Sequence, residues 1–299
     1  VSNYLENENY KFDLVVFDEA SQIRPEEAIG SIYRGKQVII AGDSKQLPPT
    51  TFFAKKIESD VDEELIEEDF YDDEIDESIL EQAVKKLPSI TLLWHYRSKN
   101  ESLIAFSNKN IYDSNLITFP CVKKSQEDFG VEFIYVEGIY QKKKKIANKI
   151  EADKVVEIIE KHIEDYGTTR SLGVIAFGER QRYTIERAIL DFRRKHLSES
   201  KYEKFFSSEL KEPFFVKNIE NVQGDERDCI IFSLAYAKNN EGKVIHNFGW
   251  LNQIGGENRL NVAISRAKKK IYIVTSITPD ELSVDGLENE GPKIFKKYL

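Results

Sequence analysis

Short apolar runs rich in β-branched residues alternate along this chain with stretches of helical periodicity. This alternation constrains the fold more than any other feature, because it is typical of βαβ units and predicts an α/β protein with parallel sheets. Helices are expected over about 151–166, ending at Gly167, and from about Glu179 onward. His162 falls on the apolar face of the first helix, and we interpret it as a packed core residue. We expect strands at 14–17, 37–41, 91–94, 131–136, 172–177, 214–219, 229–234 and 271–275.

The periodicity is lost between about residues 115 and 129, and we place a domain boundary there. A length of 299 residues suits two domains of ordinary size, which we predict at 1–115 and 116–299. The second has five expected strands with interleaved helices and reads as complete. The first has only three expected strands, so we expect it to be truncated on its N-terminal side.

The net charge of −9 is unevenly distributed along the chain. Residues 58–77 hold thirteen acidic side chains and no Lys or Arg, which predicts an exposed, self-repelling insertion. Outside this block 43 basic side chains face 39 acidic ones, so most of the chain is mildly basic. The overall acidity therefore does not exclude a nucleic-acid partner.

The sequence has no apolar stretch long enough to span a membrane and no N-terminal signal peptide pattern. Its two cysteines, Cys121 and Cys229, lie far apart without the spacing of metal ligands. Cys229 stands in an apolar run and is expected to be a buried small residue. We expect a reduced, cytoplasmic protein that does not enter a membrane.

The segment "LVVFDEASQ" (14–22) ends a β-branched run abruptly in two carboxylates, Asp18 and Glu19. Ligands of open α/β sheets bind at the carboxyl edge of the strands, where these side chains are expected. Asp18 can hold Mg²⁺ through its water shell, and Glu19 can polarise an attacking water. The alternative is an ordinary Asp-Glu pair between a strand and a loop.

The next strand repeats this arrangement in "VIIAGDSKQLPPT" (38–50), where an apolar run is followed by Gly42 and Asp43. Gln46 follows in the same loop, and two prolines stiffen the backbone after it. A neutral amide can donate to a phosphate and accept from a water. Gln46 is therefore a candidate sensor of a γ-phosphate or of its attacking water.

Three further polar stretches follow in order. "WHYRS" (94–98) places Arg97 just after a strand, and "VQGDERD" (222–228) is an acidic turn with a glycine between two strands. "NRLNVAISRAKKK" (258–270) predicts a helix on which Arg259 and Arg266, seven residues apart, share a face that is not the apolar one. An arginine on a rigid helix is suited to reach a transition-state phosphate, and the alternative is a surface salt bridge.

Together the five stretches resemble motifs II to VI of superfamily 1 helicases, in the RNA-surveillance-type branch. The wording of 94–120 and 213–228 is closer still to long bacterial DNA-helicase-related proteins. The resemblance implies two RecA-like domains with ATP and Mg²⁺ between them, and single-stranded nucleic acid across their tops. It also implies 5′ to 3′ movement, and it favours DNA over RNA.

The resemblance also implies a role for each matching residue. Asp18 would coordinate magnesium and Glu19 would activate water, while Gln46 would sense the γ-phosphate. Arg97 and Arg266 would be arginine fingers from the second domain. The residues expected to contact or surround the nucleotide are Asp43, Gly224, Glu226 and Arg259.

One departure from the family matters more than these matches, because the phosphate loop G-x-x-x-x-G-K-[ST] is absent. The Gly-Lys pairs at 35–36 and 242–243 are followed by Gln and Val. We therefore expect the C-terminal portion of a helicase core, inactive without the N-terminal part of the same polypeptide. One alternative is a catalytically inactive nucleic-acid-binding or scaffold module. Another is a nucleotide switch or transport ATPase.

Overall fold

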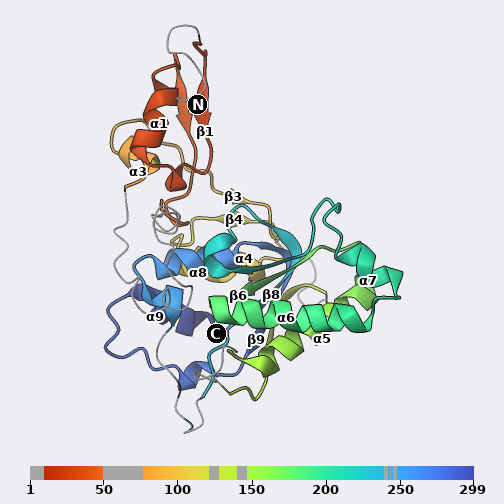
Figure 1. Cartoon of the computed structure of the whole chain (residues 1–299). Coiled ribbons are helices and arrows are strands. Elements are labelled where there is room, and N and C mark those ends of the chain that lie inside the picture. Colours follow the sequence, from red (N-terminus) through yellow and green to blue (C-terminus); the bar gives the residue numbers. More distant parts are fainter. Residues whose placement is uncertain are drawn as a thin grey trace, which may run out of the picture. The chain divides into compact units, whose positions relative to one another are not determined.

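The computed structural model describes residues 10–49, 77–120, 128–139, 147–238, 242, 244 and 248–299. The chain divides into two compact units, Val1–Leu92 and Leu93–Leu299 (Figure 1). Cys121 and most of the acidic block 58–77 lie outside the described residues. Among the helices that are described, none is both long and apolar enough to cross a membrane.

The first unit is built on two parallel strands, β1 (Val15–Phe17) and β2 (Val38–Ile40), as the sequence predicts. Between them lie the short 3-10 helix η1 (Ala20–Gln22) and α1 (Pro25–Ile32). Proline at the first helical position and two glutamates in the first turn favour the start of α1. The helix α3 (Ile79–Val84) completes a small core of Ala20, Ala28, Ile79 and Leu80.

The second unit is organised around a sheet of five parallel strands. These strands are β5 (Gly130–Tyr135), β6 (Leu172–Ala176), β7 (Phe215–Asn218), β8 (Arg227–Ser233) and β9 (Ala267–Thr275), in the order β5-β9-β8-β6-β7. Every pairing is parallel. The central strands are almost entirely buried, as expected where both faces of a sheet are covered. The predicted α/β class and all five strands of this unit are confirmed.

Helices cover both faces of this sheet. On one face α5 (Lys149–Tyr166), α6 (Glu179–Lys195) and α7 (Ser200–Phe205) pack over alternate residues of β6 and β8 (Figure 1). The described helices on the other face are α4 (Ser102–Asn110), α8 (Gly256–Ile264) and α9 (Glu290–Tyr298). The ring of Tyr298 in α9 lies 5.0 Å from that of Phe106 in α4 and 6.4 Å from that of Phe232 in β8.

Helix α5 shows how local sequence sets an element. Its N-cap residue Asn148 accepts a hydrogen bond from the backbone N–H of Glu151 at 3.1 Å, and Gly167 ends the helix at φ 53°. His162 is 2% exposed, and its Nε2 lies 3.0 Å from the carbonyl oxygen of Arg170. Burial lowers the pKa of His162, which is therefore a neutral core residue, as predicted.

Two expected elements are corrected. The strand expected at 91–94 is β3 (Trp94–His95), which pairs with β4 (Ile117–Thr118), and Leu92 is 86% exposed. The helix expected over 258–270 ends at Ile264, because the β-branched and aromatic run after Ala267 pairs with β8 as the strand β9. The prediction that Arg259 and Arg266 share a helix face is therefore wrong.

The segment from Leu93 to about residue 115 packs with the second unit, where α4 lies against β9 and α8. The two compact units thus part at Leu92 rather than near residue 115. As a boundary between the domains of a longer protein, residue 115 stays a prediction.

Candidate functional site

The two strand ends of the first unit bring their polar loops together. The N–H of Ala41 donates to the carbonyl oxygen of Phe17 at 2.8 Å, and the N–H of Ala20 donates to that of Ala41 at 2.9 Å. These two hydrogen bonds continue the parallel pairing of β1 and β2 into the loops that follow the strands. The loop that carries Asp18 and Glu19 therefore lies directly beside the loop that carries Asp43.

Gly42 permits this close approach. A Cβ atom at this position would lie only 3.0 Å from the backbone nitrogens of Ala20 and Ser21. A side-chain atom of Leu80 would lie 3.1 Å away, but the two nitrogens belong to the backbone and cannot rotate away, so a larger residue would crowd the two loops. The glycine before Asp43 thus fits the close packing of the site.

Asp18 and Glu19 are both exposed, and Oδ1 of Asp18 accepts a hydrogen bond from the N–H of Glu19 at 2.9 Å. Glu19 adopts φ 52°, a left-handed conformation that costs energy for a residue with a side chain. Strained backbone of this kind gathers at functional sites. The strain supports a functional interpretation of the Asp-Glu pair over an ordinary loop.

Asp43 positions Gln46. Its Oδ1 accepts from the N–H of Lys45 at 2.9 Å, and its Oδ2 accepts from Nε2 of Gln46 at 3.1 Å. The backbone N–H of Gln46 also donates to the carbonyl oxygen of Asp43 at 3.1 Å. The amide of Gln46 is therefore oriented by Asp43, and its Nε2 is the atom that makes the contact.

The carboxylates of the first unit can be compared with what a metal ion requires of its ligands. Within the part of the chain that the structure describes, no three His, Cys, Asp or Glu side chains are grouped to hold a metal ion. Mg²⁺ keeps several waters and is usually held by one or two carboxylates together with phosphate oxygens. The exposed Asp18, at the end of a strand, meets that modest requirement.

Within the part of the chain that the structure describes, the segment whose glycine spacing comes nearest to a phosphate loop is not folded as one. Gly30 and the pair Gly35-Lys36 do have the spacing G-x-x-x-x-G-K, although Gln37 follows. Gly30 lies inside α1, however, and Lys36 comes just before β2, which gives the order helix then strand. A phosphate loop needs the order strand, loop and helix, so this segment cannot serve as one.

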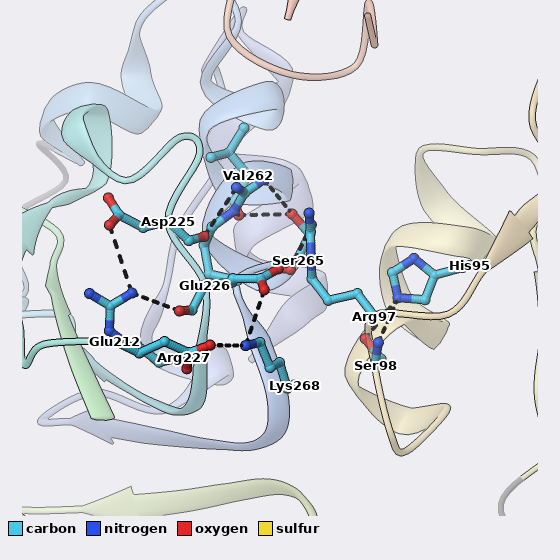
Figure 2. Close-up of polar contacts among 11 residues, drawn as sticks. His95, Arg97, Ser98, Glu212, Asp225, Glu226, Arg227, Val262, Ser265 and Lys268 are labelled. Atoms are coloured by element: carbon cyan, nitrogen blue, oxygen red, sulfur yellow. Dashed lines mark hydrogen bonds and ion pairs between the residues drawn. The ribbon is translucent and has the colours of Figure 1, made fainter. Parts of the chain in front are cut away.

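In the second unit, three of the predicted motifs converge on Arg97 (Figure 2). Its Nε donates to Oε2 of Glu226 at 2.9 Å, and its Nη1 lies 3.4 Å from the carbonyl oxygen of Ser265. The loop after β3, the turn 222–228 and the turn between α8 and β9 therefore meet at one guanidinium group. Arg97 and Glu226 are 37% and 40% exposed in their side chains, so the pair can reach a ligand.

Glu226 has a second cationic partner among the described residues. The Nζ of Lys268 lies 3.0 Å from Oε1 of Glu226 and 2.5 Å from Oε1 of Glu212 (Figure 2). Partial burial alone would raise the pKa of Glu226, but the hydrogen bond and charge of Lys268 and the charge of Arg97 hold this pKa below its usual value. Glu226 is therefore ionised at neutral pH.

The turn 222–228 is shaped by Gly224 and anchored by Arg227. Gly224 is exposed and adopts φ 83°, a conformation that glycine reaches without steric cost. Arg227 is buried, donates from Nε to the carbonyl oxygen of Pro213 at 2.8 Å and stacks on Phe215 at 4.6 Å from the ring centroid. The contacts of Arg227 thus hold the acidic turn in place.

The sequence predicted Arg266 on a helix face other than the apolar one, but it lies in the turn after α8, where it is 2% exposed. Its Nε donates to the carbonyl oxygen of Val262 at 2.9 Å, and its Nη1 donates to that of Asp225 at 3.2 Å. In this conformation Arg266 fixes the acidic turn against α8. Its predicted role as an arginine finger stays a prediction.

Arg259 is also buried, at 5% exposure, although it was expected on a helix face other than the apolar one. It forms an ion pair with Glu220, and its Nη1 donates to the carbonyl oxygen of Ile254 at 2.7 Å. The predicted site residues therefore fall into two groups and one outlier. The first unit unites Asp18, Glu19, Asp43 and Gln46, and the second unites Arg97, Gly224, Glu226 and Arg266.

Sequence reasoning missed Lys268 and Glu212. Lys268 lies in a run of three lysines, and such a run usually forms a solvated basic face, although the side chain of Lys268 is only 18% exposed. The one available signal was its place two residues after Arg266, at the start of a strand.

Comparison with known proteins adds a family relationship to this geometry. A family model described as an AAA domain matches residues 75–278, and a second model with the same description matches residues 2–54.

The uncharacterized ATP-dependent helicase MG140 of Mycoplasma genitalium is 38% identical over 294 residues, which cover 98% of this chain and 26% of that protein. The uncharacterized ATP-dependent helicase MJ0104 of Methanocaldococcus jannaschii is 27% identical over 89% of this chain and 36% of its own length. The DNA replication ATP-dependent helicase/nuclease DNA2 of Gallus gallus is 25% identical over 88% and 23%, respectively. The chain thus spans about a quarter to a third of the length of these relatives.

Proposed function

Because this chain belongs to the AAA domain family of superfamily 1 helicases, in the RNA-surveillance-type branch, we propose that it is part of the ATP-hydrolysing core of a helicase or translocase. The observation that carries the proposal is the pair of strand-end loops in the first unit. They place the strained Asp18-Glu19 pair beside an Asp43 that orients Gln46. This is an arrangement suited to nucleotide hydrolysis.

In the proposed reaction Asp18 would hold magnesium through its water shell, and the bound ion would neutralise charge on the phosphates. Glu19 accepts a proton from the attacking water, which its exposure and strand-end position allow. Gln46 is held by Asp43 through its amide nitrogen, so its amide oxygen is oriented to accept a hydrogen bond from that water.

In the second unit Arg97 is the best-supported phosphate ligand, because its guanidinium is partly exposed on a rigid framework. We propose that Gly224 and Glu226 contact the phosphate and ribose region from the adjacent turn. Arg266 is proposed as the second arginine finger, which requires that it exchange its backbone carbonyl partners for phosphate oxygens. Arg259 is proposed to act near the nucleotide from α8 while it stays paired with Glu220.

We propose that the phosphate loop is supplied by another part of the same polypeptide. The relatives extend far beyond the region that this chain matches. Among the described residues of the first unit, one face of β1 and β2 is exposed, with Val16 57% and Ile39 52% exposed. We propose that another segment of the same polypeptide packs on these side chains and that the phosphate loop it brings lies at the carboxyl edge of the strands, near Asp18.

The proposed partner is single-stranded nucleic acid, with DNA ahead of RNA, in the cytoplasm. The support for DNA is the name of the Gallus gallus relative, which is a DNA replication helicase/nuclease. The competing hypothesis is a nucleic-acid-binding or scaffold module without catalysis. This hypothesis also predicts binding of single-stranded nucleic acid, but it predicts that no ATP hydrolysis depends on Glu19.

The test is hydrolysis of ATP by the full-length protein with magnesium and single-stranded DNA, comparing the wild type with Glu19→Gln. Loss of the catalytic base should lower kcat by about 10²- to 10⁴-fold. Glu26→Gln, an exposed residue of the nearby helix α1, is the matched control and should leave kcat unchanged. Equal rates for the wild type and the Glu19 variant would support the scaffold hypothesis instead.

A further inference from the structure

Lys268 joins the Arg97 loop to the acidic turn in two independent ways. Its carbonyl oxygen accepts a hydrogen bond from the N–H of Lys99 at 2.7 Å. Its ammonium group contacts Glu226, the carboxylate that also holds Arg97 (Figure 2). One residue at the start of β9 therefore fixes both the backbone that follows Arg97 and the counter-ion of its side chain.

The two cations occupy different oxygens of Glu226. Arg97 contacts Oε2 at 2.9 Å and Lys268 contacts Oε1 at 3.0 Å. Either cation can therefore leave without disturbing the contact of the other. Lys268 is the more firmly held, because its side chain is 18% exposed against 37% for Arg97.

Glu212 keeps Lys268 in place. It contacts Nζ of Lys268 through Oε1, while its Oε2 accepts a hydrogen bond from the hydroxyl of Ser171 at the start of β6. The hydrogen bonds to Glu212 and Glu226 raise the pKa of Lys268 against the opposing effect of burial. Lys268 thus remains charged and bridges two carboxylates.

For Arg97 to reach a phosphate, it must give up its ion pair with Glu226. In a partly desolvated site, leaving a carboxylate without its only cation costs free energy, and this cost would oppose the release of the arginine. Because Lys268 stays on Glu226, that carboxylate remains compensated when Arg97 leaves. The contact of Lys268 with Glu226 therefore lowers the free-energy cost of moving Arg97 from Glu226 to a phosphate.

We propose that Lys268 is a positioning residue for Arg97, a counter-ion that lets Glu226 release the guanidinium to the nucleotide. This inference rests on the proposed function of Arg97. Without Lys268, Glu226 would bind Arg97 more tightly, and fewer of the guanidinium groups would be free for phosphate. Lys268 itself touches no reacting atom in this account.

The first test is a double-variant cycle on the full-length protein. Lys268→Ala should lower kcat for ATP hydrolysis about fivefold, the worth of one partly exposed ion pair, with a smaller change in KM. In a Glu226→Gln background the same change should have no further effect, because no carboxylate then traps Arg97. An equal loss in both backgrounds would show a merely structural role and overturn the proposal.

Lys268→Arg should restore most of the lost rate, since it keeps the charge at the bridge. Lys269→Ala is the matched control, because Lys269 is the next residue and forms its own ion pair with Asp228 at 3.0 Å. Its removal should leave kcat unchanged. A loss equal to that of the Lys268 variant would contradict a specific role for Lys268.

The second test does not depend on hydrolysis and uses the 299-residue chain labelled with ¹⁵N-arginine. The Nε–H signal of Arg97, assigned by its loss in Arg97→Lys, should exchange with water several-fold more slowly in Lys268→Ala than in the wild type. It should exchange faster in Glu226→Gln. Unchanged exchange in Lys268→Ala would overturn the proposal, whereas absent hydrolysis in the wild-type full-length protein would overturn the proposed function alone.

Discussion

Glu151 is a carboxylic acid that is fully buried without a cation beside it among the described residues. Its Oε2 accepts from the hydroxyl of Ser233 at 2.9 Å and the N–H of Ala235 at 2.8 Å. Its Oε1 accepts from Nδ2 of Asn148 and the hydroxyl of Ser276, both at 3.1 Å. The carboxyl group thus ties the start of α5 to the ends of β8 and β9.

Burial raises the pKa of Glu151 to about 7, although the hydrogen bonds oppose the shift. The folded state therefore keeps a proton that the unfolded chain releases near pH 4.5, so the stability that this proton contributes is present at pH 4 and lost as pH rises through 7. Glu151→Gln removes this dependence. The stability advantage of the wild type over the variant should be roughly 3 kcal/mol larger at pH 4 than at pH 8.

Urea unfolding at the two pH values measures this difference. Trp94 and Trp250 both lie in the second unit, so tryptophan fluorescence follows that unit. Glu157→Gln, an exposed position of the same helix, is the control and should show a nearly constant difference. A constant difference for Glu151→Gln as well would contradict the raised pKa.

The elements of the fold were predicted where one periodicity extended without interruption. The strands at 172–177 and 229–234 were recognised because buried parallel strands are continuous apolar runs. The helix over 258–270 was overextended, since Leu260, Ala263, Ile264 and Ala267 keep helical spacing into the first residue of β9. The change from helix to strand after Ile264 is determined by pairing with β8, and a strand partner that is distant in sequence leaves no local signal.

The same limit applies to the candidate site. The residue types at strand ends predicted Asp18, Glu19, Asp43 and Gln46, because the carboxyl edge of a parallel sheet gathers them. The burial of Arg259 and Arg266 and the bridge through Lys268 depend on tertiary contacts. The sequence pattern therefore misplaced the two arginines and gave no indication of the ion pairs of Lys268.

The contact between the two strand-end loops can be tested at Gly42. Gly42→Ala would place a Cβ 3.0 Å from the nitrogens of Ala20 and Ser21, an overpacking that should cost about 1–3 kcal/mol locally. Hydrogen exchange should then quicken at the amides of Ala20 and Ala41, which bridge the loops. Amides of β8 and β9 in the second unit are the internal control, and unchanged exchange at Ala20 would contradict the account.

At the scale of the whole chain, the described residues of the second unit form a sheet of five strands, whereas those of the first unit form a sheet of two. The sequence predicted five strands for the second region and three for the first, and the third of these, β3, packs with the second unit. We propose that the catalytic residues lie in this chain and that the phosphate loop comes from another part of the same polypeptide.

The most direct measurement compares ATP hydrolysis by the 299-residue chain with that by the full-length protein, with magnesium and single-stranded DNA. We expect hydrolysis by the chain alone to be no faster than that of its own Glu19→Gln variant. The full-length protein should hydrolyse ATP in a manner stimulated by the DNA and abolished by the same substitution. Robust hydrolysis by the isolated chain, lost on Glu19→Gln, would contradict the claim.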